Sequence, residues 1–125
     1  MLNSNVPAWF EIPTVDLDRA QSFYEGILGV TLKREPMGKD IELAVFPYGG
    51  KPNASGALIR HPECQPAIQG SIVYLSVENL VPVLQRATER GGDTIVPRTA
   101  LPGDMGCFAQ FRDSEGNRVG LWSPV

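Results

Sequence analysis

The chain has 125 residues, of which 42% are hydrophobic and 20% are charged, and its formal net charge is -3. This length suits one domain with a core large enough to need no disulfide or metal. The mildly acidic charge and the lack of a Lys/Arg cluster argue against nucleic acid and anionic membranes as partners, and no apolar run reaches the roughly 18 residues of a membrane helix.

The N-terminus lacks both the basic and the apolar region of a signal peptide. Without a secretory signal, we expect the two cysteines, Cys64 and Cys107, to be free thiols in a reducing compartment. These observations predict a cytoplasmic protein.

The first half predicts a strand over residues 6–12, where apolar and polar positions alternate, and then a helix. Asp16 is the expected N-cap, and Gly29 is the expected C-cap. Apolar residues recur at helical spacing between these two positions. Further strands are predicted over residues 30–33, 42–46 and 56–59, with a turn region over 47–53.

Residues 61–70 hold two prolines and a glycine and show no periodicity, so we interpret them as a linker. A strand is predicted over 71–77, followed by a helix that begins after Asn79 and ends at Gly91 and Gly92. The remaining strands are predicted over 94–96, 107–111 and 118–122, with a turn over 113–117. The loop over 97–106 is a candidate lid.

The predicted order is βαβββ, a linker, and βαβββ again. We therefore predict an α+β fold in one domain over residues 1–125. Module one covers about 6–60, the linker 61–70, and module two about 71–123. The alternative is an α+β sandwich without internal duplication.

Two segments resemble known family motifs. The segment Asp16–Gly29, DLDRAQSFYEGILG, resembles the opening helix of the vicinal oxygen chelate (glyoxalase/bleomycin resistance protein/dioxygenase) superfamily. The segment Phe111–Trp122, FRDSEGNRVGLW, resembles its closing hairpin. The resemblance implies two βαβββ modules whose curved mixed sheets surround a cavity, and it implies a homodimer.

In metal-dependent members of that superfamily, four side chains in the cavity hold a divalent ion. The matching positions here are Trp9, Gly56, Ile72 and Gly120, none of which offers an imidazole, carboxylate or thiolate donor. The resemblance therefore points to a subgroup that lacks the usual metal ligands, and we predict neither a metal nor another cofactor. His61, the only histidine, is expected at the surface.

Strand alternation places Glu11 on the cavity face, together with a mostly apolar set of residues. This set comprises Trp9, Gly56, Ile72, Tyr74, Gly120 and Trp122. It has the composition of a small-molecule pocket, although the same residues could simply fill the sheet interior. Glu11 is the candidate general base if it is buried beside Trp9, and otherwise it is a structural carboxylate.

We therefore expect a protein that binds a small, aromatic or amphipathic molecule without a divalent metal. The alternative is a lyase or isomerase of the glyoxalase-related class that uses Glu11 as a base, or one with a metal site that the sequence does not predict. A third possibility is an interaction module that binds no small ligand.

Overall fold

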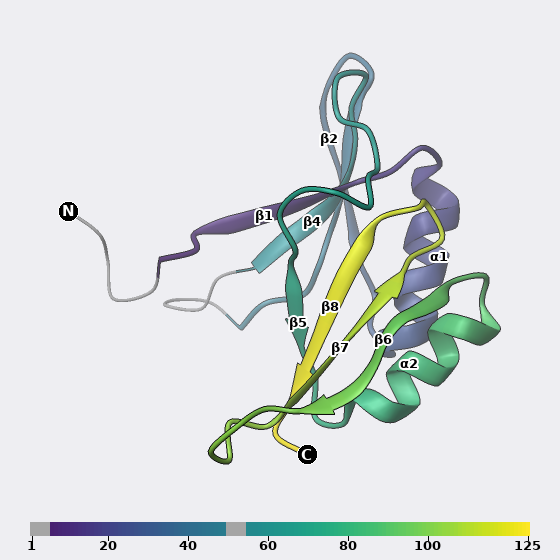
Figure 1. Ribbon diagram of the computed structural model, residues 1–125. Coiled ribbons are helices and arrows are strands. Elements are labelled where there is room, and N and C mark those ends of the chain that lie inside the picture. The colour runs from purple at the N-terminus through teal and green to yellow at the C-terminus, as the bar shows by residue number, and fades with distance from the viewer. Residues whose placement is uncertain (1–5, 50–54) are drawn as a thin grey trace.

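The computed structural model describes residues 6–49 and 55–125, which form two four-stranded sheets and two helices (Figure 1). Module one holds β1 (Trp9–Pro13), α1 (Leu17–Leu28), β2 (Lys33–Gly38), β3 (Ile41–Val45) and β4 (Ser55–Arg60). Module two holds β5 (Tyr74–Ser76), α2 (Leu80–Glu89), β6 (Asp93–Ala100), β7 (Cys107–Arg112) and β8 (Arg118–Ser123). The predicted βαβββ repeat and the α+β class are confirmed.

Local signals define both helices. The side chain of Asp16 accepts a hydrogen bond from the Arg19 amide at 3.0 Å, and α1 ends at Gly29, whose φ of 66° is in the left-handed region. The Asn79 side chain caps α2 by accepting from the Val81 amide at 3.1 Å. The expected caps at the start of both helices and at the end of α1 are therefore confirmed.

The two sheets have the same topology. Their strand orders are β1-β4-β3-β2 and β5-β8-β7-β6. In each sheet the first strand pairs parallel with the last strand of its module, and the other neighbours are antiparallel. Among the strands of the described residues, β1 and β5 are both edge strands, so each has a side that no other described strand pairs with.

One hydrophobic core serves both modules. It contains Tyr24 and Ile27 from α1, Leu58 from β4, Leu80 from α2 and Phe111 from β7. The helices contact each other, and one face of each sheet packs against them (Figure 1). The other face of each sheet is called its open face below. Neither helix is long and apolar enough to cross a membrane within the described residues.

The turn between β7 and β8 connects the modules through buried polar groups. The hydroxyl of Tyr24 in α1 donates to Asp113 Oδ2 at 2.7 Å. The side-chain amide of Asn117 donates to the same oxygen and to the carbonyl of Pro13 at the end of β1. Buried polar groups need such partners, so this turn fixes module two to module one.

Glu115 in the same turn binds the start of α1. Its Oε1 accepts from the amides of Val15 and Asp16 at 2.9 and 2.8 Å, and its Oε2 accepts from Arg19 Nε at 2.7 Å. An acidic side chain is favourable at a helix N-terminus, where amide groups lack partners within the helix. The two motifs that resemble the superfamily therefore contact each other directly.

The C-terminal end of α1 depends on α2. Arg86 donates through Nε and Nη2 to the carbonyl of Ile27 at 3.0 and 2.9 Å. Because α1 has no basic residue in its last turn, Arg86 supplies the positive charge that a helix C-terminus favours. The Arg90 guanidinium lies against Gly26, where a methyl group would come within 2.5 Å of it.

Several strand boundaries differ from the prediction. The strand expected over 6–12 is β1 at Trp9–Pro13, and the strand expected over 71–77 is paired only over Tyr74–Ser76. The strand expected over 30–33 begins only at Lys33, because Leu32 turns into the core and bonds through its backbone to Gln21 and Glu25. Residues 97–100 of the candidate lid belong to β6. Residues 50–53 of the predicted turn lie outside the described residues.

Candidate functional site

The open face of the module-two sheet carries an aromatic cluster. Tyr74 in β5 pairs in register with Gly120 in β8, and Ser76 pairs with Trp122. In β7, Phe108 pairs with Trp122, and its ring meets the Tyr74 ring edge-on at a centroid distance of 6.3 Å. We call Tyr74, Phe108 and Trp122 the aromatic floor.

Gly120 determines how the floor packs. A Cβ atom at Gly120 would lie 2.3 Å from the Tyr74 ring, which is far inside van der Waals contact. The absence of a side chain therefore lets the phenol ring lie flat over β8. Tyr74 remains 44% exposed, so its outer side is available to a ligand.

A polar chain adjoins the floor. Arg118 Nη1 donates to Gln110 Oε1 at 2.8 Å, and Gln110 Nε2 donates to the Tyr74 hydroxyl oxygen at 2.6 Å. Arg118 Nε also donates to the carbonyl of Ile68 in the linker at 3.2 Å. Gln110 is buried, whereas Tyr74 faces outward. The sequence left the direction of Gln110 undetermined and gave Arg118 no role, because both depend on the β7–β8 register.

The open face of the module-one sheet is arranged differently. Glu11 and Tyr74 are equivalent positions, since each stands five residues before the helix N-cap, Asp16 or Asn79. Glu11 pairs with Ala57, as Tyr74 pairs with Gly120. Glu11 is exposed, so the burial that would favour a general base is absent in the single chain.

The register of β1 and β4 corrects the expected place of Gly56. Gly56 pairs with Phe10, and a Cβ atom there would lie 2.4 Å from the Phe10 ring. Phe10 packs against the core, so Gly56 lies on the helix-facing side and not beside Glu11. Neighbouring side chains in a strand point to opposite faces, so a prediction that is wrong by one residue assigns Gly56 to the wrong face of the sheet. Ala57 is the position equivalent to Gly120.

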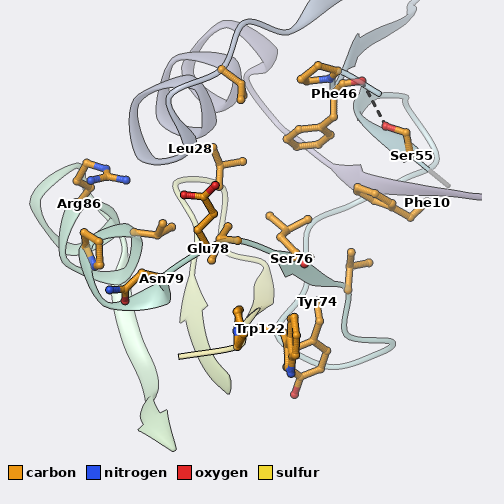
Figure 2. A pocket seen from close by; sticks show the side chains of 18 of the residues that line it. Phe10, Leu28, Phe46, Ser55, Tyr74, Ser76, Glu78, Asn79, Arg86 and Trp122 are labelled. Atoms are coloured by element: carbon orange, nitrogen blue, oxygen red, sulfur yellow. Dashed lines mark hydrogen bonds between the residues drawn. The ribbon is translucent and has the colours of Figure 1, made fainter. Parts of the chain in front are cut away.

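A cavity of about 1200 Å³ forms an open cleft between the modules (Figure 2). Figure 2 shows Phe10 and Phe46 of module one on one side, and Arg86 of α2 with the N-cap residue Asn79 on the other. Ile72, Tyr74 and Trp122 also line this cleft, so the aromatic floor borders it. The contributions of Phe46 and Arg86 were missed, although the apolar run that ends at residue 46 indicated a buried position.

The other expected site residues lie apart from this cleft. Glu11 lines a smaller cavity of about 210 Å³, together with Gln65, Asn117 and Arg118. Trp9 is 43% exposed near the free edge of β1. The structure thus brings Ile72, Tyr74, Gly120 and Trp122 together, and it leaves Trp9 and Glu11 on the other sheet.

The remainder of the candidate lid adjoins the floor. The indole N–H of Trp122 donates to the carbonyl of Met105 at 2.9 Å, and the Leu101 amide donates to the carbonyl of Gly106 at 2.8 Å. The first bond holds the loop beside the aromatic floor, and the second closes residues 101–106 on themselves. Whether this loop opens and closes stays a prediction.

The donor groups do not fit the divalent ion that the superfamily resemblance implies. With Ala57 in place of Gly56, the matching positions become Trp9, Ala57, Ile72 and Gly120, and none carries a ligand for such an ion. Among residues 6–49 and 55–125, no three His, Cys, Asp or Glu side chains group as metal ligands would. We therefore derive no chemical step through a metal.

Comparison with known proteins decides the family. The sequence profile of the Glyoxalase/Bleomycin resistance protein/Dioxygenase superfamily matches residues 7–121. The chain belongs to this superfamily. The provisionally assigned glyoxylase CFP32 of Mycobacterium bovis is 27% identical over 119 residues, which cover 93% of this chain and 44% of that protein. The chain therefore spans less than half the length of this curated relative.

Solved structures of the superfamily share the fold. A glyoxalase/bleomycin resistance protein from Albidiferax ferrireducens has a TM-score of 0.70 at 17% identity, with 95% of this chain and 98% of that chain covered. Glyoxalase I from Zea mays has a TM-score of 0.67 at 20% identity, with 94% and 45% covered. At these identities the likeness shows the fold alone.

Proposed function

We propose that this glyoxalase-like protein binds a small, planar aromatic or amphipathic molecule on its aromatic floor, without a divalent metal. The observation that supports this most directly is the position of Tyr74 and Trp122 on the margin of a cleft of about 1200 Å³. Aromatic faces stack on planar guests, and an apolar cleft removes the rest of the guest from water.

We also propose a homodimer in the cytoplasm. The free edges of β1 and β5 and the exposed apolar side chains Trp9, Ile72 and Tyr74 support self-association. A second copy could bring Trp9 and Glu11 of one chain near the floor of the other. The free cysteines, Cys64 and Cys107, support a reducing compartment.

Ligand binding is tested by a ¹H–¹⁵N NMR titration with 2-acetylnaphthalene in buffer containing EDTA. Sedimentation velocity on the same sample tests whether the protein is a homodimer. We expect a saturable shift of the Trp122 indole signal that is the same with and without EDTA. Phe108→Ala should weaken binding about tenfold, because it removes one of the three aromatic rings of the floor. Met37→Ala is the control, because Met37 is exposed on β2 in the other sheet.

No saturable shift, or an equal effect of both variants, would exclude binding on the floor. Loss of binding in EDTA, with recovery on adding a divalent ion, would exclude metal-independent binding. The alternative is a lyase or isomerase that uses Glu11 as its base. Glu11 has the same place in module one that Tyr74 has in module two, so its carboxylate lies on the open face of its sheet, and this favours the alternative. Turnover of a bound compound that Glu11→Gln abolishes would support that alternative.

A further inference from the structure

The guanidinium of Arg118 fixes the orientation of the Gln110 side chain. Arg118 can only donate hydrogen bonds, and it is held by the Ile68 carbonyl as well as by Gln110. The atom of Gln110 that faces Arg118 must therefore be the carbonyl oxygen Oε1. The amide nitrogen Nε2 then has to face Tyr74.

This orientation determines the role of the Tyr74 hydroxyl. Gln110 Nε2 can only donate, so the phenol oxygen of Tyr74 accepts this bond at 2.6 Å. The hydroxyl hydrogen of Tyr74 must point in another direction. Within the described part of the chain, no acceptor bonds to this hydrogen, and the side chain is 44% exposed beside the cleft.

We propose that Arg118 and Gln110 are positioning residues that fix Tyr74 as a hydrogen-bond donor toward the ligand. The ligand would then be a planar apolar molecule whose oxygen, as in a carbonyl or an oxyanion, accepts a hydrogen bond. A charged donor at the start of the chain strengthens each later bond, because Arg118 polarises the Gln110 amide and the amide polarises the phenol. This inference rests on the proposed function and adds a chemical requirement for the ligand.

Two probes of nearly the same shape test the requirement. 2-Acetylnaphthalene carries a carbonyl oxygen, and 2-ethylnaphthalene lacks it. We expect the wild-type protein to bind the acetyl probe about fivefold more tightly, which is the effect of one hydrogen bond in a partly exposed site. Tyr74→Phe should remove this preference and leave the affinity for the ethyl probe unchanged.

Gln110→Glu separates positioning from the mere presence of a hydroxyl. At neutral pH the new carboxylate keeps the bond to Arg118 but can only accept from Tyr74. The Tyr74 hydrogen then turns inward, so the preference for the acetyl probe should fall toward one although the hydroxyl is still present. Gln85→Glu adds the same charge at an exposed position of α2, away from Arg118, and should keep the fivefold preference.

The ethyl probe also reports on the packing of the floor. If Gln110 had a purely structural role, Gln110→Glu would lower the affinity for both probes equally, and that result would overturn the inference. A preference retained in Tyr74→Phe would overturn it as well. Equal binding of both probes by the wild-type protein would overturn the inference alone, whereas binding of neither would overturn the proposed function too.

Discussion

Glu115 shows how one side chain can stabilise the junction between the modules. Its side chain is buried against the start of α1, where it accepts from two backbone amides and from Arg19. Burial alone would raise the pKa of Glu115. The hydrogen bonds from Arg19, Asp16 and Val15 outweigh burial, so the pKa is lowered from its ordinary value of 4.5.

The lowered pKa of Glu115 predicts loss of stability in acid. The folded protein binds this proton more weakly than the unfolded chain, so the stabilisation is complete above the ordinary value of 4.5 and is lost as the pH falls through the folded pKa. We expect Glu115→Gln to lower the free energy of unfolding near neutral pH and to flatten its decline below pH 4.5. Urea unfolding over a pH series measures both effects.

Glu63→Gln is the matched control, because Glu63 is an exposed residue of the linker. It should keep both the stability near neutral pH and the steep decline in acid. If Glu115→Gln had the same pH profile as the wild-type protein, the hydrogen bonds of Glu115 would not contribute to the acid response.

At the scale of the elements, two glycines at the ends of the helices should respond to alanine in opposite directions. In Gly26→Ala the atoms nearest to the new methyl group would be those at the tip of the exposed Arg90 side chain, which can move. Alanine also favours the helix, so we expect a gain of about 0.5–1 kcal/mol. In Gly92→Ala the methyl group would lie 2.5 Å from the backbone carbonyl of Arg112, and we expect a loss of about 2 kcal/mol or more.

Thermal and urea unfolding of the two variants measure this difference. If Gly92→Ala were as stable as the wild-type protein, β7 would have to be able to move away from the end of α2. A loss in Gly26→Ala would show that the packing of Arg90 on α1 outweighs helix propensity.

The sequence predicted those elements whose signals are local. The caps at Asp16, Gly29 and Asn79 and the apolar stripes between them set the helix boundaries without any partner. The end of β6 and the whole of β2 carry polar residues and prolines, and they become strands because β7 and β3 supply hydrogen bonds. No pattern within either segment contains that information.

The same distinction applies to the candidate site. Tyr74 and Trp122 were placed correctly on one face, because alternation within β5 and β8 determines it. Gly56 was placed on the wrong face, because β4 is apolar and buried on both faces, so its own pattern does not show which face packs against the helices. The chain from Arg118 through Gln110 to Tyr74 crosses β8, β7 and β5, so only the folded sheet shows it.

At the scale of the whole molecule, the shared core determines how the modules unfold. Phe111 of module two packs against Phe23 and Tyr24 of α1, and the polar contacts of Asp113 and Asn117 cross the same boundary. Neither module keeps a complete core without the other. We therefore expect one cooperative transition although the chain consists of two similar modules.

The two tryptophans allow this prediction to be tested within each module. Trp122→Phe leaves Trp9 as a fluorescent reporter in β1, and Trp9→Phe leaves Trp122 in β8. In each variant the urea midpoint from tryptophan fluorescence should coincide with the midpoint from far-ultraviolet circular dichroism. Comparing two signals within one variant removes any stability difference between the variants. A Trp9 transition at lower urea than the dichroism transition would mean that module one unfolds first, and the contacts of Phe111 and Asp113 with α1 would then be too weak to couple the modules.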